Sequence, residues 1–199
     1  MNYYYKELPA GYHAVKEIDA VGNKKFAVGM NLAALPLMLV SGAAAWLLRF
    51  SGERLVLDNP MSLGAAWMAF CAGILVYLVL HELMHGMVYH LMTGEKLHFG
   101  LSWSCAWCGV PDIYVTRRTA LCALLAPFVL FSAVFIALIC LCDGLAAATA
   151  ILLFAVHFGG CAGDLYDTLL LLFRFRGDIL MRDTGPKQTF YARDTAPHA

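Results

Sequence analysis

Four long apolar stretches constrain the fold of this chain more than any other feature of its sequence. They cover residues 26–50, 61–92, 120–142 and 145–173. A helix needs about 20 largely apolar residues to cross a bilayer, and each stretch is at least that long. The whole chain is 61% hydrophobic and only 14% charged, whereas soluble domains are about a quarter charged. We therefore expect an all-α membrane protein with about four transmembrane helices.

The distribution of charged residues predicts the orientation of these helices. Basic residues concentrate at both ends of the chain and between the second and third stretches, whereas the connection between the third and fourth carries only Asp143. Lysine and arginine mark the cytoplasmic side of a span. The predicted organisation is a cytoplasmic tail (1–25), a transmembrane domain (26–174) and a second cytoplasmic tail (175–199). A formal net charge of +0 provides no basic surface for nucleic acid.

The connection between the second and third stretches differs from its neighbours. Residues 97–103 alternate weakly between polar and apolar side chains, and residues 112–116 are rich in strand formers. Gly109 and Pro111 lie between these two segments. We expect a short β-hairpin at the cytoplasmic face.

The second stretch contains His81-Glu82-Leu83-Met84-His85. Residues typical of helix ends lie on either side of it, namely Asn59-Pro60 at its start and Gly94 at its end. Residues four apart lie on one face of a helix, so both imidazoles can reach one metal ion. Glu82 then lies beside the metal, where its carboxylate can take a proton from a zinc-activated water molecule. This is the H-E-x-x-H pattern of zinc peptidases. The alternative interpretation is a helix end wetted by the cytoplasm, but ionisable groups within a span cost at least about 2.5–3.5 kcal/mol to insert, which favours a function.

Hydrolytic zinc usually has three protein ligands, so a third must come from elsewhere. Asp164 and Asp167 lie three residues apart on one helical face of the fourth stretch. The second and fourth stretches are predicted to run in the same direction, which gives Asp164 a depth similar to that of the histidines. We predict Asp164 as the ligand, with Asp167 as the alternative or as a group that orients a ligand histidine. His157 either stabilises the oxyanion or binds substrate, or it only hydrogen-bonds a neighbouring helix.

Cys105 and Cys108 form a C-x-x-C pattern in the predicted cytoplasmic loop. Such a pair can bind metal or act in redox chemistry. A second ligand pair is missing, and nearby tryptophans are typical of an interfacial loop. We therefore favour a structural role for both cysteines.

Taken together, these residues resemble the site-2-protease type of intramembrane metalloprotease. In size and in its Gly163-Asp164 element, the chain is closer to the zincin peptidase family of small bacterial membrane proteins. The similar parts follow in order: His81 to His85, the loop leading to Arg117-Arg118, Ala126-Pro127 and Gly163-Asp164.

This resemblance implies that His81, His85 and Asp164 hold zinc and that Glu82 is the general base. The chain departs from the site-2 pattern where Leu165 follows the aspartate in place of glycine. His157 stands about where that class has an asparagine.

We therefore expect an intramembrane zinc metalloendopeptidase of a bacterial cytoplasmic membrane. Its expected partners are the lipid bilayer and a membrane protein or peptide substrate, and no oligomeric state is predicted. The alternative is a non-catalytic metal-binding membrane protein with a structural, sensing or transport role. The third stretch carries no charge between residues 121 and 142, which argues against transport.

Overall fold

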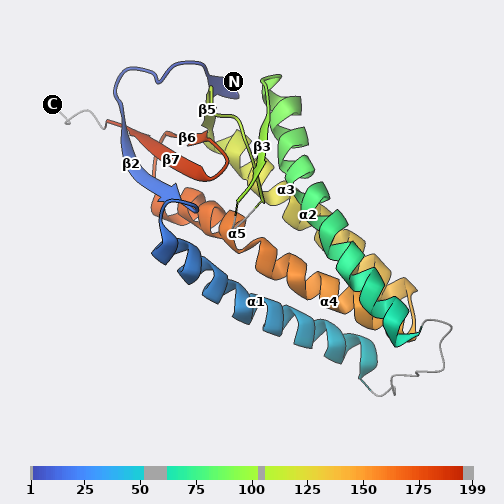
Figure 1. The fold of residues 1–199 in the computed structure, drawn as a ribbon. Coiled ribbons are helices and arrows are strands. Elements are labelled where there is room, and N and C mark those ends of the chain that lie inside the picture. Colours follow the sequence, from blue (N-terminus) through green and yellow to red (C-terminus); the bar gives the residue numbers. More distant parts are fainter. Residues whose placement is uncertain (1, 52–61, 103–105, 195–199) are drawn as a thin grey trace. The chain divides into compact units, whose positions relative to one another are not determined.

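The computed structural model of the chain describes residues 2–51, 62–102 and 106–194. Three of its helices are long and apolar enough to cross a membrane, namely α1 (Lys24–Phe50), α2 (Leu63–Thr93) and α3 (Arg117–Leu141). Figure 1 shows them in blue, green and yellow. Their bounds agree with the first three apolar stretches to within about three residues, so these predictions are confirmed.

Local residues explain where α1 begins and α2 ends. The side chain of Asn23 accepts a hydrogen bond from the Phe26 N–H at 3.1 Å, which caps the start of α1. Gly94 has a φ of 69°, and its N–H donates to the His90 carbonyl at 2.8 Å. Gly94 thus closes α2 as predicted. Asn59 and Pro60, the predicted start of that helix, lie outside the described residues.

The fourth apolar stretch is interrupted. Helix α4 (Gly144–Gly160) ends at Cys161, and α5 (Ala162–Leu169) then continues into a π-helical turn, η1 (Leu170–Arg174). These elements make a further span only when they are counted together, so the chain has three or four membrane-length helices. Glycines flank the interruption, and glycine disfavours a continuous helix because of its backbone freedom.

Both ends of the chain enter a five-stranded antiparallel sheet, which corrects the expectation of an all-α fold. The strand order is β1-β5-β6-β7-β2 (Figure 1). Residues 1–25 and 175–199, expected to be tails, supply four of the five strands. The strands are short, and their pairing joins distant residues, so a search for long apolar runs does not detect them. Their bounds are β1 (Tyr4–Tyr5), β2 (Tyr12–Asp19), β5 (Tyr114–Thr116), β6 (Ile179–Asp183) and β7 (Lys187–Arg193).

A separate hairpin pairs β3 (His98–Leu101) with β4 (Ala106–Gly109). The predicted hairpin had the right first strand, but its expected partner, residues 112–116, contributes β5 to the larger sheet instead. The hairpin packs against α2 at Gly86, where an added Cβ would lie 2.8 Å from the Phe99 ring. Glycine at this position therefore permits the close approach.

The chain divides into two compact units. The sheet unit comprises residues 1–28, 81–126 and 164–199, and the helical unit comprises residues 29–80 and 127–163. The sheet unit contains both sheets and has its own apolar core. The largest fully buried side chains of this core are Tyr89, Phe190, Ile113, Leu171 and Met181.

Small residues let the helices of the helical unit approach one another closely. A Cβ added at Gly73 of α2 would lie 2.9 Å from the Leu153 side chain of α4. One added at Gly42 of α1 would lie 3.1 Å from the Cβ of Ala155. Small residues at helix contacts are typical of membrane proteins, where van der Waals packing drives helix association.

Candidate metal site

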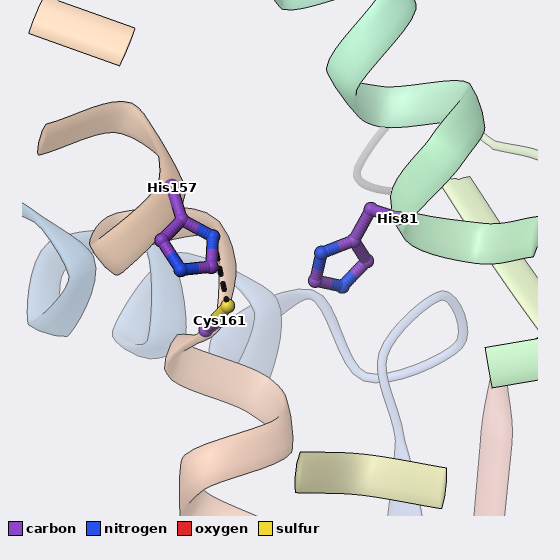
Figure 2. Close-up of side chains that lie close together, drawn as sticks. All are labelled: His81, His157 and Cys161. Atoms are coloured by element: carbon purple, nitrogen blue, oxygen red, sulfur yellow. Dashed lines mark hydrogen bonds between the residues drawn. The ribbon is translucent and has the colours of Figure 1, made fainter. Parts of the chain in front are cut away.

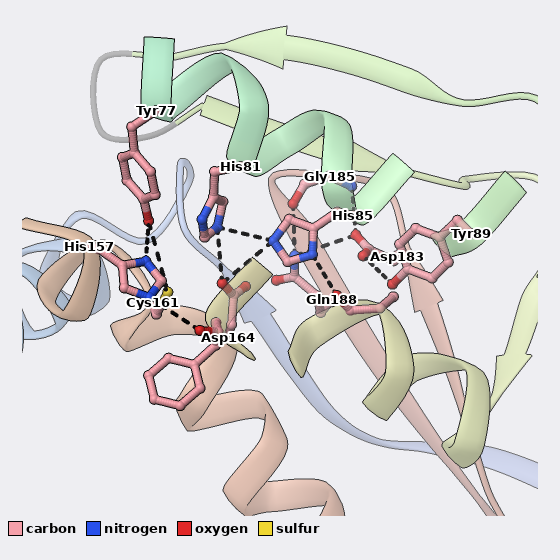
Figure 3. Close-up of polar contacts among 12 residues, drawn as sticks. Tyr77, His81, His85, Tyr89, His157, Cys161, Asp164, Asp183, Gly185 and Gln188 are labelled. Carbon is pink, nitrogen blue, oxygen red and sulfur yellow. Dashed lines mark hydrogen bonds and ion pairs between the residues drawn. The ribbon is translucent and has the colours of Figure 1, made fainter. Parts of the chain in front are cut away.

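Two histidines of α2 and one aspartate of α5 converge in the sheet unit (Figure 3). His81 and His85 lie one helical turn apart and are both buried, with their Nε2 atoms 3.2 Å apart. The Oδ2 atom of Asp164 lies 3.2 Å from His81 Nε2 and 3.5 Å from His85 Nε2. These three side chains could hold a metal ion.

The donor atoms fit zinc in both chemistry and spacing. In a tetrahedral site with bonds of about 2.0–2.1 Å, neighbouring ligand atoms lie about 3.3 Å apart. The separations of 3.2, 3.2 and 3.5 Å agree with that value. Two imidazole nitrogens and one carboxylate oxygen also leave a fourth position for water or substrate, as in catalytic zinc sites.

The backbone of α3 determines which nitrogen of His85 faces the site. His85 Nδ1 lies 2.9 Å from the Ala123 carbonyl oxygen, and because a carbonyl only accepts, Nδ1 carries the proton. The lone pair of Nε2 is then directed at the other two donors. Pro127, four residues later in α3, has no N–H to donate to the Ala123 carbonyl, so the imidazole does not share that oxygen with the usual intrahelical donor. Pro127 thus leaves the Ala123 carbonyl without an intrahelical partner and available to His85.

The two aspartates of α5 have different surroundings. Asp164 belongs to the group with the histidines, whereas Asp167 is buried with its Oδ1 lacking a hydrogen-bond partner within the described residues. Residues three apart on a helix differ by about 60° in direction, which is enough to separate the two carboxylates. Glu82 follows His81 and is half-buried, about 100° further around α2.

A comparison with known families supports this picture. The sequence model of the family described as "Putative zincin peptidase" matches residues 74–179, more than half of the chain. The chain belongs to this family. No curated protein and no solved structure matches it. All four residues of the predicted zinc chemistry, including Glu82, lie within the matched region of this zincin-family member.

His157 of this family member lies in the helical unit and is completely buried. Its Nδ1 is 2.9 Å from the Tyr77 hydroxyl and its Nε2 is 3.0 Å from Ser132 Oγ. Figure 2 shows its contact with Cys161, whose Sγ lies 3.5 Å from Nδ1. Partners at both ring nitrogens favour the interpretation of a histidine bonded to neighbouring helices. Six aromatic rings surround the imidazole: those of Tyr77, Phe128, Phe131, Phe135, Phe154 and Phe158.

Sequence reasoning missed Asp183, which is buried at the end of β6 in the sheet unit. Its carboxylate accepts hydrogen bonds from the Tyr89 hydroxyl at 2.8 Å and from the Gly185 N–H at 2.9 Å (Figure 3). Tyr89 lies one turn after His85, so this contact anchors the histidine-bearing end of α2 to the β6–β7 hairpin. Burial raises the pKa of Asp183 to about 6, although the hydrogen bonds lower it. No pattern in the sequence points to this contact, because 94 residues separate Tyr89 from Asp183.

The C-x-x-C pattern is only partly described. Cys105 lies outside the described residues, whereas Cys108 is buried in β4. Burial raises the pKa of the Cys108 thiol to about 12. Because metal binding and redox chemistry both need the thiolate, this environment favours the structural role.

Proposed function

We propose that this chain is an intramembrane zinc metalloendopeptidase of the site-2-protease type. One observation carries the proposal: His81 Nε2, His85 Nε2 and Asp164 Oδ2 converge at 3.2–3.5 Å in a member of a zincin peptidase family. Glu82 stands next to this group in the position that the H-E-x-x-H pattern gives to a general base. In this proposal the first three residues hold zinc and Glu82 transfers protons.

The chemistry divides between the metal and the carboxylate. Bound zinc supplies Lewis acidity, which lowers the pKa of a water molecule and polarises the carbonyl of the scissile peptide bond. Glu82 takes a proton from the attacking water and then delivers it to the nitrogen of the leaving amine. The hydrogen bond from His85 Nδ1 to Ala123 keeps the imidazole in the orientation that binding requires.

The proposed substrate is a membrane protein or peptide held in an extended conformation. Strand β3 pairs with β4 along one edge, and no strand within the described residues pairs with its other edge. The hairpin packs against Gly86, which directly follows His85. A substrate segment that adds to β3 as a strand would expose its peptide bonds, which a helix hides. Phe99 and Leu101 on β3 are exposed and available to contact substrate side chains.

The proposed location is a bacterial cytoplasmic membrane with both termini in the cytoplasm. The three or four membrane-length helices support an integral membrane protein. The orientation rests on the basic residues that flank the spans, since such residues remain on the cytoplasmic side.

The test combines zinc analysis with cleavage of tagged single-span membrane proteins produced in the same cells. We expect one zinc per chain in the wild-type protein and in Glu82→Gln, and loss of zinc in His85→Ala and Asp164→Asn. Glu82→Gln should lose cleavage by about 100-fold or more, because it removes the general base without removing a ligand.

Glu95→Gln is the matched control, because Glu95 follows the end of α2 and pairs with Lys6 at 3.2 Å. It should cleave like the wild-type protein. A wild-type protein without zinc would refute the proposal. Stoichiometric zinc with equal cleavage in wild type and Glu82→Gln would instead favour the alternative, a metal-binding membrane protein without peptidase activity.

A further inference from the structure

The helical unit contains an apolar groove between α1, α3 and α4. Its volume is about 540 Å³. None of its lining residues belongs to the candidate metal site. Several of them, including Val40, Leu48 and Ile136, are more than half exposed, so the groove opens to the surroundings of the unit. The complete lining is Leu37, Val40, Ser41, Ala44, Ala45, Leu48, Arg49, Ile136, Ile139, Cys140, Phe154 and Phe158.

The length of the groove corresponds to one leaflet of a bilayer. On α1 the lining runs from Leu37 to Arg49, and these twelve helical steps span about 18 Å. The hydrocarbon core of a bilayer is about 30 Å thick, so each leaflet contributes about 15 Å. The length of this apolar groove therefore matches the thickness of one leaflet, which is the distance that one acyl chain spans.

One end of the groove is polar. The guanidinium of Arg49 donates to the carbonyls of Ile139 and Cys142 and to the carboxylate of Asp143. These contacts place the ion pair where α3 ends and α4 begins. The Asp143 side chain remains 86% exposed. A cation and an exposed anion thus lie side by side at one end of the apolar groove.

We propose that this groove binds one acyl chain of a phosphatidylethanolamine molecule, with the headgroup at Arg49 and Asp143. The planar guanidinium suits the phosphate, and the Asp143 carboxylate suits the primary ammonium. This zwitterionic headgroup complements the ion pair, whereas a purely anionic headgroup would face the exposed carboxylate.

The size and lining of the groove suit one long, unbranched chain. Its length is about 18 Å, its volume is about 540 Å³, and its lining is mostly apolar. An acyl chain can fill such a groove with hydrocarbon while its headgroup lies at the polar end.

The experiment uses the full-length protein in phosphatidylcholine nanodiscs that contain increasing amounts of phosphatidylethanolamine with a photoactivatable acyl chain. After illumination, mass spectrometry locates and quantifies the labelled residues. We expect saturable labelling, at one lipid per chain, concentrated on the groove residues of α1 and α4. Unlabelled phosphatidylethanolamine should compete for this labelling.

Two variants of α1 provide the sharpest comparison. Ala45→Phe fills the groove and should reduce groove labelling at least fivefold. Ala43→Phe adds the same ring at an exposed position that does not line the groove, and it should label like the wild-type protein. Equal labelling in the two variants would overturn the proposal, as would labelling that rises linearly with lipid and spreads over all exposed apolar faces.

The headgroup assignment has its own test. Asp143→Asn removes the partner of the ammonium while Arg49 keeps its carbonyl contacts. This variant should lose the preference for phosphatidylethanolamine over a photoactivatable phosphatidylcholine but still label in the groove. An unchanged preference would overturn the headgroup assignment. Saturation and competition in the wild-type protein test chain binding even if Ala45→Phe fails to fold.

Discussion

Replacing Asp183 with asparagine should stabilise the protein at neutral pH and leave its stability at low pH nearly unchanged. Burial in the folded state raises the pKa of Asp183 from 3.8 to about 6. Below pH 3.8 the carboxyl group is protonated in both the folded and the unfolded chain. Between these two pKa values it ionises first in the unfolded chain, so rising pH favours unfolding. Above the folded-state pKa both states are ionised and the free energy of unfolding no longer changes from this source.

The size of this effect follows from the two pKa values. Each pKa unit corresponds to about 1.4 kcal/mol, so the wild-type protein should lose about 3 kcal/mol from this group between about pH 4 and pH 7. Asparagine still offers an oxygen to the Gly185 N–H but does not ionise. Tyr89→Phe should have the opposite effect, since it removes a donor that lowers the pKa of Asp183. In that variant the decline should extend to higher pH.

The assay is denaturant unfolding of the metal-free protein in detergent micelles across this pH range. The difference between wild type and Asp183→Asn at each pH cancels the titration of all groups that the two proteins share. Asp178→Asn controls for the change in net charge, because Asp178 is an exposed carboxylate that pairs with Arg193 at 3.6 Å. A constant difference between wild type and Asp183→Asn across the pH range would refute the reasoning.

Two further substitutions test the surroundings of the site. Pro127→Ala restores an N–H that competes for the Ala123 carbonyl. Zinc affinity, measured against a chelator, should therefore fall by roughly 10-fold, as when a group that orients a metal ligand is lost, while the free energy of unfolding rises. An unchanged affinity would contradict the role given to the proline. Gly185→Ala should lower Tm by at least roughly 2–8 °C. A φ of 93° alone costs an L residue about 1–2 kcal/mol, and the new Cβ would also collide with the Trp107 ring. Gly177 also has a positive φ, 74°, but nothing lies within 4 Å of a Cβ added there. Gly177→Ala should therefore lower Tm by less than Gly185→Ala does. An equal drop in Tm would show that the contact with the Trp107 ring contributes nothing.

Local patterns in the sequence were sufficient for the helices and for the paired histidines. An apolar run of membrane length can bury its backbone polar groups only by forming a helix, so α1, α2 and α3 were predictable to within a few residues. His81 and His85 share a helix face because their spacing matches one turn. The glycine that ends α2 was also readable, because a left-handed residue terminates a helix through its own backbone geometry.

Pairing between distant segments was not predictable in the same way. The five-stranded sheet joins Tyr12 to Arg193, and its short strands have little apolar periodicity of their own. A strand's partner depends on register and loop closure across the whole chain, which a single sequence does not display. The expected all-α fold was therefore wrong at both ends of the chain.

The sequence determined one part of the candidate metal site, and the tertiary structure determined the rest. The sequence alone determined that two imidazoles and a glutamate share one segment of α2, because helical periodicity acts over a single turn. Only tertiary packing decided that Asp164 rather than Asp167 joins the histidines, that the Ala123 carbonyl orients His85, and that Asp183 anchors Tyr89 from 94 residues away. The physical reason is that these contacts depend on how separate helices and strands pack against one another. The spacing of residues along the sequence does not predict that packing.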